Sequence, residues 1–457
     1  MKLIPGCCSC LILFSSIVLC SANELSSTPG QLDTSEVNAS VAVLDQQVRS
    51  IQEKLGPHDI SLIQPVREKA LLLYEAGQHD DVVGALNDLI YLHRVNHGLY
   101  DMAQLQYLEM LISSNLAQKN WKAVNDNYRQ LEWLQRRNFR KDSTELLEAL
   151  DKLIAWHLLA TALKTGTHPG EHFLELERLH EQAVIIAEAH PELGKQALAQ
   201  RLYKLALVHY YIAIAVQRGA PVGQYLAHEI DPIKRGESYD TTADRIALKK
   251  FRRSRDLVAR ATELYIEEKD IKGANAMARL YLADWDLLFN RRVSAKQGYR
   301  ETCEKLLQAG YSQEFINNFF QQPKVLPSYE FEPDLLANYD SDSEFTKSET
   351  MEFVGWSKDL PGVQFPKSAI HAQARKNPDS YSLVTFGVKK DGLAEKIKIN
   401  RDNADKNLSR RITHNAIWSA QFRPRLEDGK VVAVSGLSTR FYMPQFEGEQ
   451  ADKSEEK

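Results

Sequence analysis

The longest feature of this sequence is an almost unbroken helical pattern from residue 41 to residue 326. Leu, Ala, Glu, Gln, Lys and Arg dominate it, while Gly and Pro are confined to short interruptions such as Gly56-Pro57 and His190-Pro191. One bundle cannot bury so many helices, so the chain needs units that stack on one another. The pattern therefore predicts an all-α repeat domain.

A recurring spacing of 42 residues supports this prediction. It separates equivalent residues near the start of the pattern: Gly56 and Gly98, Val82 and Val124, Leu89 and Leu131, Leu92 and Leu134, and Arg94 and Arg136. Each unit is predicted to be a helix, a tight turn and a second helix. Within Ala278–Gly310, Trp285-x-x-Leu288 and Ala295-x-x-x-Tyr299 resemble the tetratricopeptide repeat.

The middle of the pattern, residues 155–233, keeps the helical period and loses the register. Long insertions, degenerate repeats and a non-repetitive helical domain remain alternatives for it. Large aromatic residues are predicted to fill the core between helices, because each unit must bury its apolar face on a neighbour. They are Trp156, Tyr203, Tyr210, Tyr211, Trp285 and Phe289.

A different pattern begins at Tyr381. Tyr381–Val388 alternates β-branched and aromatic residues and predicts a strand. Asp391-Gly392 predicts a tight type I′ hairpin turn, and Leu393–Asn400 the return strand. Leu408, Ile412, Ala416 and Ala420 then recur every four residues, as on one face of an amphipathic helix.

The last strand is predicted at Val431–Tyr442, after a helix stop at Phe422-Arg423-Pro424 and a turn at Glu427-Asp428-Gly429. The resulting β-β-α-β order and its motifs resemble the C-terminal domain of the TonB family. The matching motifs are Val384-Thr385-Phe386, Asp391-Gly392, Phe422-Arg423-Pro424, Asp428-Gly429-Lys430 and Phe441, with Phe365-Pro366 standing where the family has Tyr-Pro. The resemblance covers about 80 of 457 residues. It departs from the family in a longer segment after Phe365 and in Pro378-Asp379-Ser380, where a glycine is usual.

The N-terminus is predicted to be a secretory signal. Lys2 precedes the apolar run Leu11–Cys20, and the small residues Cys20 and Ala22 favour cleavage after Ala22. Two alternatives are a lipoprotein with Cys20 at its N-terminus, which Leu19 disfavours, and an uncleaved inner-membrane anchor, for which the run is short. The predicted location is therefore the periplasm.

The expected organisation is a multidomain chain: an all-α, tetratricopeptide-like array followed by a small α+β, TonB-like domain. Its segments are a signal peptide (1–22), a disordered lead (23–40), the helical repeat domain (41–326), an acidic linker (327–360), the TonB-like domain (361–446) and a disordered acidic tail (447–457). Between Phe365 and Tyr442 there are fifteen Lys and Arg against seven Asp and Glu, whereas the whole chain has a net charge of −4. The basic domain could attract acidic partners, dock on the acidic array, or only present a solvated face.

No catalytic or metal-binding signature stands out. Four of the five cysteines fall in the predicted signal, and Cys303 is expected to be a small buried residue. His168 and His172 are four residues apart, but Pro169-Gly170 disfavours a regular helix there. His180-Glu181 has no second histidine after it, as a metalloprotease helix would require. We therefore expect no enzyme, no metal, no cofactor and no nucleic-acid partner.

The TonB resemblance implies binding of an extended segment of an outer-membrane receptor by strand addition to the closing strand. By that analogy, the partner-binding residues are Phe365, Pro366, Val432, Val434, Ser435, Gly436, Ser438, Arg440 and Phe441. Arg423 and Arg425 are expected to be surface charges that affect only the rate of association.

The function expected is a periplasmic protein-binding adaptor for outer-membrane TonB-dependent receptors or other envelope proteins. The alternatives are a membrane-anchored energy transducer and a structural protein that binds peptidoglycan. The membrane is a partner only where the N-terminal segment is retained.

Overall fold

The computed structural model describes most of the helical region and the core of the C-terminal region. The described residues are 34–163, 169–219, 221–231, 238–268, 272–328, 331–332, 336, 351–354, 381–402 and 408–442. The predicted signal, the residues Phe365 and Pro366, and the predicted tail lie outside them. Within the described residues the chain is mostly helical, with a few short strands near the C-terminus.

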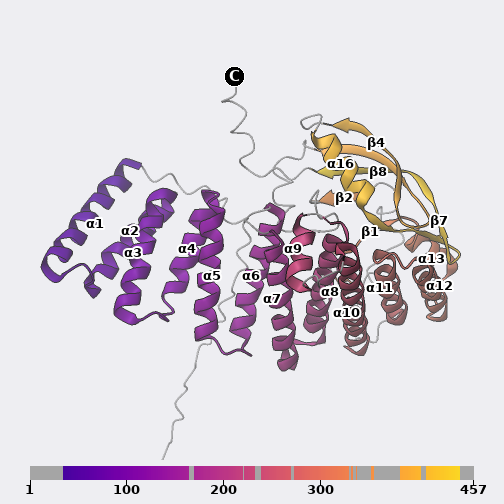
Figure 1. Ribbon diagram of the computed structural model, residues 1–457, viewed down its shortest axis with the longest axis horizontal. Helices are drawn as coiled ribbons and strands as arrows, with labels where there is room; N and C mark the ends of the chain where they lie inside the picture. The colour runs from indigo at the N-terminus through magenta and orange to yellow at the C-terminus, as the bar shows by residue number, and fades with distance from the viewer. Residues whose placement is uncertain are drawn as a thin grey trace, which may run out of the picture.

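The helices stand side by side in one long row, which bends little from α1 to α12 (Figure 1). They are α1 (Thr34–Leu55), α2 (Ile63–Glu75), α3 (His79–His97), α4 (Gln104–Ala117), α5 (Trp121–Asn138), α6 (Thr144–Leu163), α7 (Pro169–Ala189), α8 (Lys195–Gln217), α9 (Pro221–Ile230), α10 (Tyr239–Glu268), α11 (Ala274–Leu288), α12 (Arg292–Gln308) and α13 (Gln313–Phe319), with 3₁₀ turns η2 (Ile60–Leu62) and η3 (Pro191–Leu193). Consecutive helices contact each other along most of the row.

Three of the tight turns that join described helices share one geometry. Gly77, Lys119 and Asn290 all adopt positive φ, at 70°, 56° and 60°. In each turn the next residue donates its N–H to a carbonyl five residues earlier, over 2.7–3.0 Å. Only glycine reaches this region without strain, so the lysine and asparagine are held there by the helices they join.

A side-chain hydrogen bond also recurs at the 42-residue spacing seen in the sequence. Asn96 donates its amide to a carbonyl four residues earlier, at 2.9 Å, and to one 38 residues earlier, at 3.0 Å. Asn138 makes the same two bonds at 3.0 Å. Each asparagine thereby ties its own helix to the loop that precedes the helix before it, α2 for Asn96 and α4 for Asn138.

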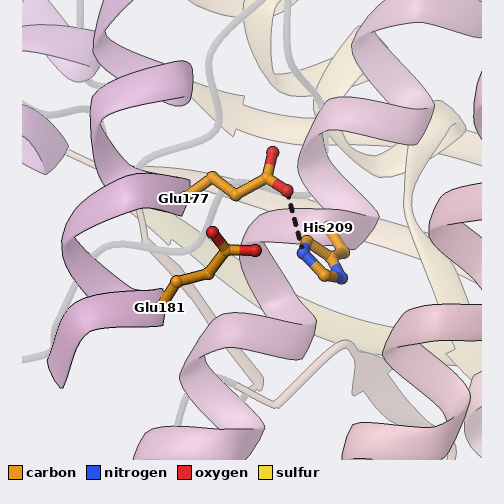
Figure 2. A group of neighbouring side chains, drawn as sticks. All are labelled: Glu177, Glu181 and His209. Atoms are coloured by element: carbon orange, nitrogen blue, oxygen red, sulfur yellow. Dashed lines mark ion pairs between the residues drawn. The ribbon is translucent and has the colours of Figure 1, made fainter. Parts of the chain in front are cut away.

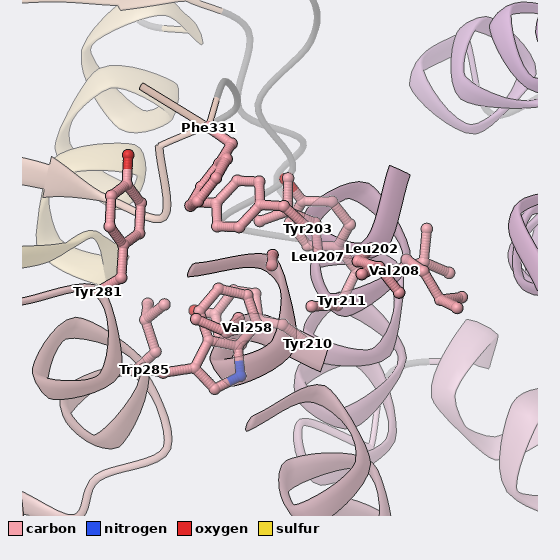
Figure 3. Packing of buried hydrophobic residues seen from close by; sticks show 14 of the residues in the cluster. Leu202, Tyr203, Leu207, Val208, Tyr210, Tyr211, Val258, Tyr281, Trp285 and Phe331 are labelled. Carbon is pink, nitrogen blue, oxygen red and sulfur yellow. The ribbon is translucent and has the colours of Figure 1, made fainter. Parts of the chain in front are cut away.

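The apolar side chains form two clusters along the row. One lies among α2 to α6, and the larger one extends from α6 to the C-terminal region, where it includes Leu426. Figure 3 shows the aromatic centre of the larger cluster, where the Tyr203 ring lies 5.2 Å from Phe331 and 5.9 Å from Trp285. Burial of the predicted core aromatics is confirmed: five of the six are at most 5 % exposed, and Phe289 is partly buried against them.

The strands in the described part of the chain form three small sheets. They are β1 (Lys324–Leu326), β2 (Met351–Val354), β3 (Tyr381–Val388), β4 (Ala394–Asp402), β5 (Gln421–Arg423), β6 (Arg425–Glu427), β7 (Lys430–Val432) and β8 (Val434–Tyr442), with helix α16 (Leu408–Ser419) between β4 and β5. The largest sheet has the order β2-β8-β3-β4, in which β2 runs parallel to β8 and the other pairs are antiparallel. The predicted hairpin, helix and closing strand are therefore present in the predicted order.

The hairpin turn differs in type from the prediction. Gly392 has φ 77°, but Asp391 does not adopt positive φ, as a type I′ turn would require. The N–H of Gly392 bonds to Lys389 O at 2.9 Å, and the N–H of Lys389 bonds to Leu393 O at 2.9 Å. This pattern fits a longer loop, in which one glycine in the left-handed region follows an ordinary turn.

The C-terminal sheets lie against the end of the helical row, over α11, α12 and α13 (Figure 1). Strand β1, which directly follows the helices, pairs antiparallel with the distant strand β5, so that Val325 lies opposite Phe422. The N–H of Leu426 bonds to Phe320 O at 3.2 Å. The two parts thus dock on one another, as one of the three interpretations of the charge distribution expects.

Three predicted boundaries need correction. Helix α1 begins at Thr34, inside the predicted disordered lead, because Val37 is buried at 2 % exposure. The helical domain ends with α13 at Phe319, since Lys324–Leu326 is a strand of the C-terminal region. The predicted linker also contributes structure, because Phe331 and Leu336 lie in the large apolar cluster and residues 351–354 form β2.

Among the described helices, none combines the length and the apolar character that crossing a membrane requires.

Candidate functional site

The candidate site is the closing strand, β8, where most of the predicted partner-binding residues lie. Val434, Ser435, Gly436, Ser438, Arg440 and Phe441 belong to it. Phe365 and Pro366 fall outside the described residues. Val432 lies elsewhere, because Ala433 separates β7 from β8, and Val432 pairs with Arg425 in the small β6–β7 hairpin.

One flank of β8 is filled by β3, which pairs with it from Tyr381 to Val388. The opposite flank was predicted to be free, and that prediction is wrong for half of the strand. Residues 351–354 pair there, with Met351 opposite Thr439 and Val354 opposite Tyr442. A segment of the same chain thus already occupies this part of the edge. The physical reason is general: unpaired N–H and C=O groups at the edge of a sheet readily accept a further strand.

The other half of β8 carries a bulge. In the ladder with β3, Phe386 pairs with Leu437 and Val388 with Val434, so that two residues of β8 oppose Gly387. These two residues are Ser435 and Gly436, and Gly436 adopts a φ of 75°. A bulge twists an edge strand and interrupts its line of hydrogen-bonding groups. The straight and uncovered part of the edge, among the described residues, is therefore short.

Side-chain exposure along β8 follows the strand alternation. Ser438 and Arg440 are exposed, whereas Thr439 between them is fully buried. Ser435 and Gly436 are exposed at the bulge. The solvent-facing side of β8 thus offers small polar groups and one arginine, Arg440, so strand addition there would depend mainly on the backbone.

The Phe422-Arg423-Pro424 motif lies where the C-terminal region meets the helices. Phe422 is fully buried beside Phe386, with ring centroids 5.4 Å apart. The guanidinium of Arg423 is also buried and forms a bidentate ion pair with Asp284 of α11, with Nε 3.0 Å from Oδ1. The prediction that Arg423 is a surface charge is wrong, because its side chain joins the two parts of the molecule.

A second group of buried charges was missed in the sequence. Figure 2 shows Glu177 and Glu181 on α7 facing His209 on α8. Their ligand atoms lie within 4.8 Å of one another, which is close enough for a metal site. The sequence signal was the four-residue spacing of the two glutamates, but it does not reveal which residue of another helix faces them.

Two cations already neutralise these carboxylates. Lys250 Nζ of α10 lies 2.5 Å from both oxygens of Glu177, and Arg253 lies 2.6 Å from Glu181. A divalent metal ion would meet both positive charges at short range. We therefore interpret the α7 cluster (Glu177, Glu181, His209, Lys250 and Arg253) as an ion-pair network that holds three helices together.

Burial alone would raise the pKa of Glu177, but the His209 ring and the Lys250 charge outweigh it and lower this pKa to about 2. Nearby, burial lowers the pKa of His180 to about 3. Burial and the neighbouring His172 likewise lower the pKa of His157 to about 3. His157 and His180 are therefore neutral in the folded protein.

Two further residues singled out in the sequence have structural positions. His172 is buried at the start of α7, with Nδ1 2.9 Å from His157 Nδ1, while His168 lies outside the described residues. Helix α7 begins at Pro169, where a proline is tolerated, so the expectation of no regular helix at this point is wrong. Cys303 is buried, as predicted, and burial raises the pKa of its thiol to about 11.

Comparison with models of known protein families and with curated proteins found no match for this chain.

Proposed function

We propose that this chain is a non-catalytic adaptor that binds an extended segment of a partner protein alongside β8. One observation carries the proposal: β2 already lies against Thr439–Tyr442 as an added strand. Strand addition depends on backbone groups, so an edge that accepts one short segment can accept another of suitable direction and length.

The proposed partner segment replaces β2. Between the bulge at Ser435–Gly436 and the β2 ladder, the described part of the chain leaves only Leu437 and Ser438 uncovered, and two residues are too few for a stable strand pair. A partner that pairs along Leu437–Tyr442 must therefore displace residues 351–354. The excess of Lys and Arg in this region favours an acidic segment and speeds its approach.

The same proposal assigns a TonB-like fold to the C-terminal region and a tetratricopeptide-like fold to the helices. The order β3, β4, α16, β8 follows the TonB-like pattern, and the motif residue Phe422 lies in the domain core. The shared turn geometry at Gly77, Lys119 and Asn290 supports a tetratricopeptide-like array. The helical part would then be a second protein-binding module, since such arrays present extended surfaces.

The proposed location is the periplasm, based on the predicted signal that ends at Ala22. The proposed partners are acidic, extended segments of outer-membrane receptors. Intact mass of the mature protein distinguishes this adaptor from an anchored transducer, because an adaptor starts at Asn23 and a transducer keeps its N-terminal segment.

The test is a titration of the purified mature chain with fluorescent receptor segments, followed by anisotropy. Glu352→Pro and Phe353→Pro are made separately, because proline deletes an N–H and only one of two adjacent residues directs its N–H toward β8. One of the two variants should bind a segment more tightly than the wild type, since β2 no longer competes. The control is the same segment with alternate residues changed to proline, which should not bind.

The proposal fails if no segment binds at millimolar concentration to the wild type or to either variant. Sedimentation with purified peptidoglycan, run in parallel, would in that event support the cell-wall alternative.

A further inference from the structure

A cavity of about 340 Å³ lies among α10, α11 and α12, on the helical part of the molecule. Its lining is rich in arginine: it comprises Phe251, Arg255, Arg279, Asp286, Arg291, Ser294 and Gln297. We call it the arginine pocket. It is separate from β8 and takes no part in the strand addition proposed above.

Arg279 is held in a fixed position in this pocket. Its Nε lies 2.5 Å from Glu301 Oε2, and Glu301 is in turn positioned by Gln297 through a bond of 2.8 Å to Oε1. The Arg279 Nη1 is buried and has no hydrogen-bond partner among the described residues. A buried guanidinium N–H without an acceptor is costly, so an acceptor from a ligand would stabilise it.

Gly298 creates the space for this guanidinium. A Cβ at this position would come within 2.8 Å of Arg279 Nη1 and 2.7 Å of the Ala283 Cβ. Because Gly298 has no side chain, α12 packs closely on α11 and the Arg279 guanidinium still fits between the two helices.

Arg291 supplies a positive charge that no carboxylate neutralises in the described part of the chain. Its guanidinium carbon lies 4.4 Å from the centre of the Phe251 ring, which holds it over the pocket wall. Its backbone is fixed by a 2.7 Å bond from its N–H to Asp286 O. Arg291 is also the N-cap of α12, and Ser294 lies in the first turn, where the helix dipole favours negative charge.

The charges around the pocket leave a positive excess. Asp286 lies 3.2 Å from Arg255 and Glu301 pairs with Arg279, so two of the three guanidinium groups have carboxylate partners. The third, Arg291, has none among the described residues. Planar guanidinium groups bind carboxylate and phosphate oxygens through paired hydrogen bonds, and the Ser294 hydroxyl and Gln297 amide add neutral donors.

We infer that the arginine pocket is a binding site for an oxyanion, the phosphate or carboxylate group of a small molecule. Arg291 provides the free charge and Arg279 the buried donor. Asp286 and Glu301 hold the guanidinium groups apart, so that the pocket stays open.

The test is calorimetric titration of the purified mature chain with inorganic phosphate and, separately, with citrate, at constant ionic strength. We expect saturable binding of one of them, and the tighter of the two identifies the group. Arg291→Gln should weaken that binding about tenfold, because it removes the unpaired charge while leaving the packed side chains in place.

The matched control is Arg300→Gln. Arg300 is an exposed arginine of the same helix that pairs only weakly with Glu304, at 3.8 Å, and does not line the pocket. Its replacement should leave the affinity unchanged. The inference is overturned if neither anion binds saturably below about 20 mM, which corresponds to negligible affinity, or if the two variants weaken binding equally.

Discussion

Two buried groups of charges in this molecule have similar chemistry and different surroundings. In the α7 cluster, Glu177 has two partners: His209 at 3.2 Å, on α8, which packs on α7, and Lys250 at 2.5 Å, on α10, which packs on α8. In the interdomain pair, Asp284 holds Arg423, which is 139 residues away in sequence and has no other carboxylate partner among the described residues. The first group reinforces a contact that apolar packing has made. The second group joins two parts of the molecule that are far apart in sequence, beside the β1–β5 pairing and the shared apolar cluster.

The largest effect is therefore expected at the interdomain pair. Asp284→Ala leaves the Arg423 guanidinium buried without a counter-charge and also removes the acceptor of the Tyr299 hydroxyl, now 3.0 Å away. Breaking a buried pair in this way costs about 3–5 kcal/mol of unfolding free energy. Urea denaturation followed by circular dichroism measures it.

The control is Asp428→Asn, which removes an exposed negative charge that meets Asn317 across the same interface and keeps a residue type that tolerates the φ of 50°. It should cost less than about 1 kcal/mol. A loss from Asp284→Ala as small as that of the control would show that the sheet does not depend on the buried pair.

Acid should destabilise the helices around α7 through two buried histidines that lie outside both groups. His157 and His180 are neutral when folded, because burial lowers their pKa to about 3, but they titrate near 6.5 when unfolded. The unfolded chain therefore binds more protons between these pH values, and stability falls as pH drops from about 6.5 toward 3. Between pH 7 and pH 5 we expect each histidine to lower the free energy of unfolding by about 2 kcal/mol, measured by urea denaturation.

The pH dependence should arise in the helices near α7, since the interdomain pair contains no histidine. His180→Phe should remove the roughly 2 kcal/mol that this histidine contributes. Glu177 makes no contribution in this range, because its pKa of about 2 lies below the unfolded value of 4.5, so the stability it adds is lost only as pH falls from about 4.5 through 2. An unchanged pH dependence in His180→Phe would exclude this histidine as a source.

Gly392→Val tests the docked side of the hairpin. Its Cβ would meet Phe422 O at 2.2 Å and Leu287 of α11 at 3.2 Å, in addition to the strain of φ 77°. We expect a loss of about 3 kcal/mol in urea denaturation, from overpacking and left-handed strain together. Gly436→Val is the comparison, because Gly436 has a similar φ of 75° but open space around it, and should cost about 1–2 kcal/mol. Equal losses would mean that strain alone matters and that the close contacts around Gly392 contribute nothing.

The smallest effect is expected from Lys250→Met. Glu177 keeps His209 at 3.2 Å. Burial lowers the pKa of the His209 ring and the Lys250 charge lowers it further, so removing the lysine favours a protonated ring beside Glu177. We expect a loss of about 1–2 kcal/mol, less than at Asp284, because a second partner remains. Arg253→Met, at the exposed edge of the cluster, should change stability by less than about 0.5 kcal/mol. If Lys250→Met proves as costly as Asp284→Ala, His209 does not substitute for the lysine.

The local elements of this fold were predictable from the sequence because their signals are local. Strand β3 has the predicted bounds, and the amphipathic period located α16 to within a residue at each end. The closing strand was predicted as one piece, since the break at Ala433 and the bulge at Gly436 depend on neighbouring strands.

The contacts between distant segments could not be predicted in this way. Nothing in Arg423 distinguishes a surface arginine from one that meets Asp284, and nothing in residues 351–354 shows that they pair with β8. The arginine pocket likewise joins residues from three helices. Such pairings depend on how whole elements pack, which a pattern along one chain segment does not record.

The contact between the C-terminal region and α12 has a consequence for the end of the helical row. A row of stacked helices leaves an apolar face on its last member, and repeat proteins cover that face with a polar terminal unit. Here Leu426 and Val431 pack into the same apolar cluster as Cys303 and Leu306 of α12. The C-terminal region thus serves as the cap of the row, and a fragment truncated after residue 328 should aggregate through the surface that this cap protects.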